Sequence, residues 1–292
     1  MMKLGRRQAI TGILFGLASA VLGRKFMTTK KERMPAIFLG HGSPMNAIES
    51  NDFTKKLEKL GQGLRRDYSR PKAVLMISAH WETEGTWVTG MDHPKTIHDF
   101  YGFPKALYDV RYPADGNASL ADEIAKAIKK PRVNIDKKQW GLDHGTWSVL
   151  KHIFPEADIP VVQLSLDRNQ SYEYHYELGK KIRFLRDEGV MIMGSGNIVH
   201  NLRMMSRKHR YLGLDWAIEF DEWVKDKLLK REDAPLVSDA LKTQAGKFSI
   251  PTDEHYLPLL YVLGSSLEED KITFDYEGFE LGSLSMRSVR YY

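Results

Sequence analysis

The chain has 292 residues, of which 42% are hydrophobic and 28% are charged, and it contains no cysteine. The absence of cysteine excludes disulfides, thiolate metal ligands and cysteine nucleophiles, so histidine and oxygen ligands would have to bind any metal. Residues 1–33 hold eight Lys/Arg and one Glu, whereas the rest of the chain holds 35 basic and 37 acidic residues. A domain so close to neutrality lacks the basic surface of a nucleic-acid-binding protein, so we expect no nucleic-acid partner.

Residues 1–33 differ in character from everything that follows. A basic start with adjacent Arg6 and Arg7 precedes an apolar stretch over residues 9–22, which is short for the roughly 20 residues that cross a bilayer. This layout is typical of a signal peptide, and the paired arginines resemble a twin-arginine export signal. We therefore expect a targeting segment over residues 1–33 and export to the periplasm, with a membrane-anchored or a cytoplasmic protein as the alternatives.

The remaining residues, 34–292, alternate between two kinds of pattern. Continuous apolar runs of strand length occur at residues 36–40, 73–79, 160–166 and 190–196, and amphipathic helical patterns occur at residues 51–66, 119–130 and 172–189. Such alternation predicts βαβ units and a buried, largely parallel sheet. Strand-like segments in residues 272–292, separated by glycines, predict an antiparallel addition. The expected fold is a single α/β domain with a mixed central sheet flanked by helices and C-terminal antiparallel strands.

Five of the ten histidines lie in turns or at the ends of predicted elements. His41, His80 and His200 each follow an apolar run, His144 lies in the glycine-flanked turn "GLDHG", and His255 precedes the apolar segment "YLPLLYVLG". The crevice beyond the carboxyl ends of parallel strands is where α/β proteins bind ligands. We therefore expect His41, His80 and His200 to converge on one rim of the sheet, where His144 and His255 could join them.

Several motifs together resemble a known family. The strings "FLGHGSPM", "SAHW", "TIHDFYGFP", "WGLDHGTW", "GSGNIVHNL" and "EHYLPLLYVLG" occur in this order, and they resemble the bacterial 4,5-DOPA extradiol dioxygenase family, relatives of the class III extradiol ring-cleavage enzymes. The resemblance implies that residues 34–292 form a catalytic domain that cleaves a DOPA-like catechol with O₂ to a ring-opened semialdehyde. The substrates are therefore small molecules, and we infer no stable protein partner.

The resemblance also implies roles for particular residues. A single non-haem metal would be bound by His41, His80, His200 and His255, with Fe(II) as the catalytic ion and Zn(II) as another possible occupant. His144 would act as the acid–base residue, and Asp143 beside it could orient its ring. His98 and Asp99 could line the substrate pocket, although an ordered surface turn explains their motif equally well.

The ligand set leaves the metal and the reaction open. The common non-haem iron site has two histidines and one carboxylate, which Glu82 or Glu254 could supply, whereas an all-histidine site is more typical of zinc. The "GHGS" string also resembles small tetrapyrrole metal chelatases. A non-catalytic zinc-binding relative is a further alternative, because a fold does not fix a function.

Overall fold

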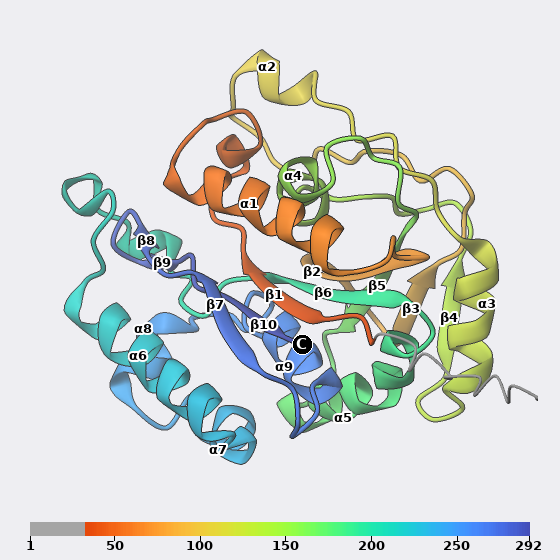
Figure 1. The fold of residues 1–292 in the computed structure, drawn as a ribbon. Coiled ribbons are helices and arrows are strands. Elements are labelled where there is room, and N and C mark those ends of the chain that lie inside the picture. Colours follow the sequence, from red (N-terminus) through yellow and green to blue (C-terminus); the bar gives the residue numbers. More distant parts are fainter. Residues whose placement is uncertain (1–32) are drawn as a thin grey trace, which may run out of the picture. The chain divides into compact units, whose positions relative to one another are not determined.

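A computed structural model describes residues 33–292, and all but the last residue of the predicted targeting segment lies outside this range. An eight-stranded sheet forms the centre, with the strand order β4-β3-β5-β2-β6-β1-β10-β7 (Figure 1). Its strands are β1 (Ala36–Gly40), β2 (Ala73–Thr83), β3 (Thr86–Thr89), β4 (Val133–Asp136), β5 (Val161–Asp167), β6 (Val190–Gly196), β7 (Ile272–Tyr276) and β10 (Ser288–Tyr291). A short hairpin of β8 (Phe279–Glu280) and β9 (Leu284–Ser285) lies apart from this sheet.

The strand directions confirm the predicted mixed sheet. Strands β5, β2, β6 and β1 are parallel neighbours, and they include the four apolar runs identified in the sequence. The C-terminal β10 pairs antiparallel with β1, and β7 pairs antiparallel with β10. At the other edge, β3 contacts β5 in the antiparallel direction and pairs parallel with β4. The carboxyl ends of the four central strands therefore lie at one edge of the sheet, as ligand binding requires.

Helices cover both faces of the sheet (Figure 1). They are α1 (Asp52–Asp67), α2 (Lys105–Tyr108), α3 (Ala118–Ala127), α4 (His144–Ile153), α5 (Tyr172–Ile182), α6 (Asp215–Lys230), α7 (Asp233–Ser238), α8 (Gln244–Ser249) and α9 (Leu257–Ser265), with 3-10 turns η1 (Pro44–Ala47), η2 (Arg183–Arg186), η3 (Leu202–Met204) and η4 (Arg207–His209). None of the described helices combines the length and the apolar character needed to cross a bilayer.

Two hydrophobic cores, one on each face, follow from the alternation of side chains along the strands. In β1, Ile37 packs into the core beneath α1 and α4, whereas Phe38 packs into the core shared with α5, α6 and α9. Both side chains are completely buried. The central strands are apolar on both faces for this reason, which is why their sequences are continuous rather than alternating.

The structure corrects the sequence prediction around His144 and His255. His144 is the first residue of α4, a helix that the glycines of "GLDHG" concealed, and Asp143 caps it by accepting a hydrogen bond from the backbone N of Thr146 at 3.1 Å. Pro251 and Thr252 are typical of a helix start and predict a helix there, but α9 begins only at Leu257. Both histidines nevertheless lie where a helix starts, and this fixes their backbones.

The described domain is anchored at its first residues. The backbone N of Met34 donates to the carbonyl of Arg186 at 3.0 Å, and the Met34 side chain is only 2% exposed. Arg186 is fully buried, forms an ion pair with Asp270 at 2.6 Å and donates to the Met34 carbonyl. Arg33, which the sequence placed in the leading segment, pairs with the partly exposed Asp187. These contacts connect the first described residues to the rest of the domain.

Candidate metal centre and active site

His41 lies directly after β1, and the backbone around it is closely packed. A Cβ atom on Gly40 would lie 2.6 Å from the backbone of Met286, and Gly42 adopts a positive φ of 57°. Glycine is therefore required on both sides of His41. The His41 side chain is 1% exposed, and its Nδ1 lies 3.0 Å from the Oγ of Ser195 at the end of β6.

Ser195 determines which nitrogen of His41 carries the proton. The Ser195 hydroxyl has a single hydrogen, which it donates to the carbonyl of Gly145 at 2.6 Å. Its Oγ must therefore accept a hydrogen bond from His41 Nδ1–H, so that Nε2 of His41 carries an unshared lone pair. The sequence prediction did not include Ser195, although its place in "GSGN" at the end of a buried strand was a usable signal.

His80 lies in a part of β2 where the pairing with β5 is irregular. Ile77 pairs with Leu164 and Glu82 pairs with Leu166, so β2 has three more residues than β5 between these two pairs. Such irregularities are common beside active sites because they turn a side chain in a new direction. Here the irregularity places His80 Nε2 3.1 Å from His41 Nε2, and His80 Nδ1 3.4 Å from a carboxylate oxygen of Asp99.

His255 reaches the same place from the loop before α9. Its carbonyl accepts a hydrogen bond from the backbone N of Asn197 at 2.8 Å, and its Nδ1 lies 3.0 Å from Oε1 of Glu254. A Cβ atom on Gly196 would lie only 2.1 Å from the His255 carbonyl oxygen, so this loop packs directly on the end of β6. Glu254 thus orients the His255 ring, and its carboxylate leaves the Nε2 lone pair free.

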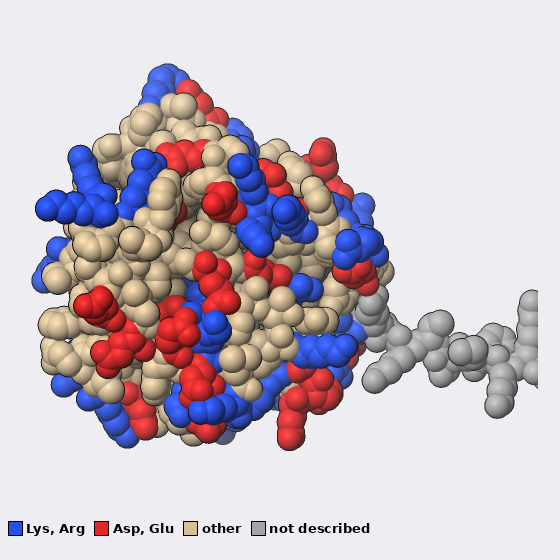
Figure 2. Space-filling model, turned by 60° about the vertical axis from the view of Figure 1, so that its left-hand side comes forward, with Lys and Arg blue, Asp and Glu red and all other residues tan. Residues whose placement is uncertain are grey.

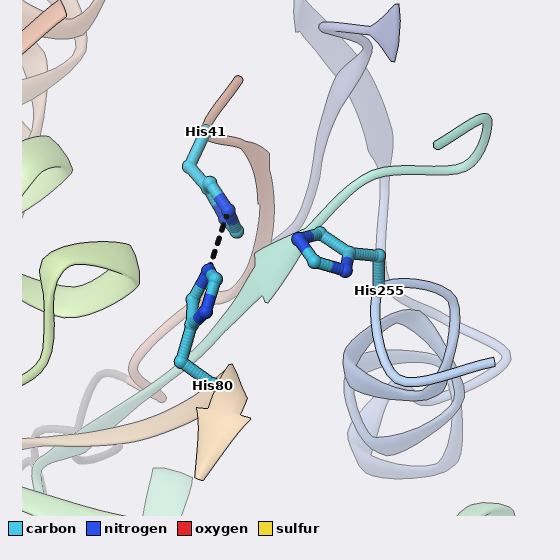
Figure 3. A group of neighbouring side chains, drawn as sticks. All are labelled: His41, His80 and His255. Atoms are coloured by element: carbon cyan, nitrogen blue, oxygen red, sulfur yellow. Dashed lines mark hydrogen bonds between the residues drawn. The ribbon is translucent and has the colours of Figure 1, made fainter. Parts of the chain in front are cut away.

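The imidazoles of His41, His80 and His255 converge, and Figure 3 shows the ring of His255 pointing toward the His41–His80 pair. One nitrogen of each ring lies within 4.8 Å of the other two. Burial lowers the pKa of His41 and His255 well below its usual range and the pKa of His80 to about 3, so all three rings are neutral near pH 7. Neutral imidazole is the form that binds metals.

These three residues fit a metal ion. The Nε2 atoms of His41 and His80 lie 3.1 Å apart, a contact marked in Figure 3 in which the tautomers decide the donor. An oxygen faces Nδ1 of each ring, at 3.0 Å for His41 and 3.4 Å for His80, and favours the tautomers in which both Nε2 atoms carry lone pairs. Two facing lone pairs repel each other unless a cation lies between them. Metal–imidazole bonds of roughly 2.0–2.1 Å also bring ligand nitrogens to about 3 Å from one another.

His200, the fourth predicted ligand, is placed differently. It follows β6, its backbone N donates to the carbonyl of Ser249 at 2.9 Å, and its ring stacks on His255 with centroids 3.4 Å apart and an interplanar angle of 6°. Together with Glu254 and His255 it forms a second group of possible ligand atoms. Burial lowers its pKa to about 4, so it too is neutral near pH 7.

Asp99 and His144 form a second unit beside the three histidines. The carboxylate of Asp99 accepts hydrogen bonds from the backbone N and from Nδ1 of His144, each at 2.9 Å. The His144 ring centroid lies 3.9 Å from that of His80 and 5.6 Å from that of His41. Burial raises the pKa of Asp99, but the hydrogen bonds and charge of His144 outweigh it, and the net pKa is below the usual value. Asp99 is therefore ionised and fixes the tautomer of His144.

Asp143 and His98, for which the sequence suggested roles in the site, make their hydrogen bonds elsewhere. Asp143 does not contact the His144 ring, because its carboxylate accepts hydrogen bonds from Ser78 Oγ and Gln163 Nε2, both at 2.6 Å. His98 lies beside Asp99 in the sequence, but its Nε2 donates to the carbonyl of Val110 at 3.1 Å. Asp99, rather than Asp143 or His98, is thus the residue that orients His144.

A cluster of buried neutral imidazoles beside an oriented histidine, at the carboxyl ends of parallel strands, defines an α/β metalloenzyme site. The family described as the catalytic LigB subunit of aromatic ring-opening dioxygenase matches residues 35–283. The chain belongs to this family, and it is an extradiol dioxygenase.

Similar proteins agree with this assignment. The chain is 50% identical over 261 residues to the 4,5-DOPA dioxygenase extradiol of Escherichia coli K12, covering 88% of this chain and 94% of that protein. It is 36% identical over 258 residues to the 4,5-DOPA dioxygenase extradiol of Beta vulgaris, covering 87% and 95%. A crystal structure of an uncharacterised protein from Escherichia coli K12 has a TM-score of 0.76 and 45% identity, covering 88% and 99%. The match confirms the predicted α/β fold.

Proposed function

We propose that this enzyme opens the ring of a DOPA-like catechol with O₂ and releases a semialdehyde, using Fe(II). The relatives named 4,5-DOPA dioxygenase extradiol support the substrate class. One observation carries the mechanism: three histidine rings converge on one point, and the hydrogen-bonded pair Asp99–His144 lies beside them. Catechol and O₂ together contain all the atoms of the product, so the reaction needs no additional reductant.

The metal is bound, on this proposal, by His41, His80 and His255, with His200 as a fourth ligand beside them. When bound, a ferrous ion supplies the redox chemistry that couples a catechol to O₂. Zinc would occupy the same nitrogen ligands without that chemistry, because Zn(II) is redox-inert. The protein contributes by holding these rings neutral and, in His41 and His255, by directing the Nε2 atom through an Nδ1 hydrogen bond.

His144 moves the protons. Because Asp99 accepts from its Nδ1–H, the Nε2 atom is available to take a proton from a catechol hydroxyl. The negative charge of Asp99 then stabilises the imidazolium, which returns the proton when the O–O bond is cleaved. His80 is 20% exposed at its side chain whereas His41 is enclosed, so we infer that the catechol and O₂ approach past His80.

Oxygen uptake tests this proposal. The protein is loaded anaerobically with Fe(II) and then mixed with L-DOPA and air. We expect one O₂ consumed per catechol and a yellow ring-opened product, while the zinc-loaded protein and His41→Ala form none. Oxygen consumption without ring opening would contradict the proposal. Chelatase activity is not expected, because only the "GHGS" string supported it whereas the family match covers residues 35–283; porphyrin metallation checks this directly.

We also propose that residues 1–33 direct export to the periplasm. The support is the sequence alone, with its paired Arg6 and Arg7 before an apolar stretch. Replacing both with lysine should leave the full-length protein in the cytoplasm, since twin-arginine signals depend on the arginine pair. Cell fractionation with an antibody measures this, and unchanged periplasmic protein would refute a twin-arginine route.

A further inference from the structure

A charged pocket lies beside the loop that follows His41. It has a volume of about 350 Å³, within the range of roughly 300–1,000 Å³ that is typical of small-molecule sites, and we define it by Ser43, Asn46, Glu49, Arg207, Arg210 and Glu280. These residues lie in or next to η1 and η4 and in β8, which is labelled on the left side of Figure 1. Figure 2 brings that side forward and shows basic and acidic side chains interspersed across it, with no field of a single sign.

The pocket adjoins two of the site histidines through the chain. Ser43 is two residues after His41, which limits their Cα separation to about 7.6 Å. The Asn46 amide donates both to the His41 carbonyl at 3.3 Å and to Glu280 at 2.7 Å. On the other side, Leu281 lines the pocket and lies three residues before Leu284, which pairs with His200.

The acidic wall of the charged pocket contains one fixed and one free carboxylate. Glu280 accepts from Asn46 and from the backbone N of Ser43 at 3.2 Å, so it is held in place. The absence of a side chain at Gly42 permits this, since a Cβ atom there would lie 2.6 Å from the Glu280 carboxylate. Glu49 forms no side-chain hydrogen bond or ion pair with any residue in the range 33–292.

The basic wall contains two guanidinium groups whose hydrogen-bond donors are unused. Within the described part of the chain, Arg207 and Arg210 form no side-chain hydrogen bond or ion pair. The guanidinium of Arg210 lies 5.3 Å from the ring centroid of Tyr211, a cation–π contact that limits its motion while leaving its N–H groups available. Two arginines facing two glutamates match a zwitterion, because guanidinium binds carboxylate and carboxylate binds ammonium.

We propose that the charged pocket binds the α-amino-acid end of an aromatic substrate, with Arg207 and Arg210 on its carboxylate and Glu49 on its ammonium group. The inference rests on the proposed function, because it assumes that the catechol ring lies at the histidines. It makes these residues determinants of specificity rather than of catalysis. A catechol without charged substituents would gain nothing from them.

Steady-state kinetics with four catechols tests the proposal. For Arg207→Gln and Arg210→Gln we expect KM to rise about tenfold for L-DOPA and for 3-(3,4-dihydroxyphenyl)propionate. It should change less than twofold for dopamine and 4-methylcatechol, which lack a carboxylate. Glu49→Gln should raise KM for L-DOPA and dopamine only. Arg203→Gln is the matched control, because Arg203 is exposed on η3 and does not line the pocket.

Binding of L-tyrosine separates this inference from the proposed function. L-Tyrosine carries the same amino-acid end but is not a catechol, so equilibrium dialysis reports the pocket without any turnover. We expect the double variant Arg207→Gln/Arg210→Gln to weaken L-tyrosine binding at least tenfold, and Arg203→Gln to leave it unchanged. Equal L-tyrosine affinity in the double variant and the original protein overturns the inference, even if 4-methylcatechol is still opened. If the original protein opens no catechol ring but still binds L-tyrosine at least tenfold more tightly than the double variant does, only the proposed function is contradicted.

Discussion

At the residue scale, the site depends on oxygen atoms that face the Nδ1 nitrogens of three ligand imidazoles and favour a proton there. Ser195, Asp99 and Glu254 face the Nδ1 atoms of His41, His80 and His255, respectively. Such partners make a histidine a better ligand because they select the tautomer and orient the ring. A histidine in a sequence carries no sign of which partner it will have, and this is why the sequence indicated the ligands but not the residues that prepare them.

The first prediction concerns metal content. Alanine at His41, His80 or His255 should lower bound iron and zinc strongly, because each removes one of three convergent nitrogens. His93→Ala is the control, since the His93 side chain is 85% exposed. Elemental analysis after metal loading measures the effect. Full occupancy after any one of the three substitutions would remove that residue from the ligand set, and His200→Ala decides whether the fourth histidine belongs to it.

The second prediction separates proton transfer from metal binding. His144→Ala should keep its metal and slow ring opening by about 10²–10⁴-fold, as expected for a lost general acid–base. Asp99→Asn should slow it by about 10–100-fold, because the amide no longer fixes the His144 tautomer. His98→Gln should have little effect, since glutamine can still donate to Val110. Rates and metal content are measured on the same samples, and metal loss in His144→Ala would identify it as a ligand instead.

At the element scale, the chemistry is placed where regular structure ends. His41 and His200 follow β1 and β6, His144 starts α4, and His80 occupies an irregular part of β2. The apolar runs predicted these strands because buried parallel strands are apolar on both faces. The irregularity in β2 was not predictable, because it depends on the register against β5.

The third prediction tests the contact between β6 and the loop before α9. Gly196→Ala would place a Cβ atom 2.1 Å from the His255 carbonyl oxygen, and backbone cannot move aside cheaply. Overpacking of this kind costs about 1–3 kcal/mol, and it should also lower metal affinity because it displaces His255. Gly63→Ala in α1, where a Cβ atom would meet nothing within 4 Å, should instead stabilise by about 0.5–1 kcal/mol. Denaturant unfolding measures the free energy of unfolding of both variants. Equal values for Gly196→Ala and Gly63→Ala would be inconsistent with this packing.

At the scale of the whole molecule, buried neutral histidines link stability to pH. Burial lowers the pKa of His175 and His200 to about 4 and that of His80 to about 3. An unfolded chain has histidine pKa values near 6.5. Between these values the unfolded state binds more protons than the folded state, so stability falls as pH decreases.

The fourth prediction follows from this linkage. The metal-free protein should lose stability as the pH falls from about 6.5 to about 4, by up to roughly 3 kcal/mol for each histidine whose pKa is lowered to about 4. His175→Asn should give a flatter dependence in this range, because His175 lies outside the metal site and contacts Tyr261 at 3.0 Å. Urea unfolding across the pH range measures the slope. An unchanged slope would show that His175 is protonated in the folded state.

The fifth prediction concerns the start of the domain. A chain beginning at Met34 should fold and bind metal, because Met34 is buried and its backbone is held by Arg186. Removing Arg33 breaks ion pairs with the partly exposed Asp187 and Glu269, which contribute at most about 1 kcal/mol. Thermal unfolding and metal content of the two chains provide the comparison. Insoluble protein from the shorter chain would mean that the fold needs residues before Met34.

The sequence by itself predicted the four central strands, the mixed α/β sheet and the five histidines that we place in the site. It could do so because apolar continuity and glycine-flanked histidines are local properties. Only the tertiary structure decided that Asp99 rather than Asp143 orients His144, that Ser195 directs His41, and that Arg207 and Arg210 share a pocket with Glu49. The partners in each of these contacts are 45 or more positions apart in the sequence. Their proximity is therefore set by how the strands and helices pack.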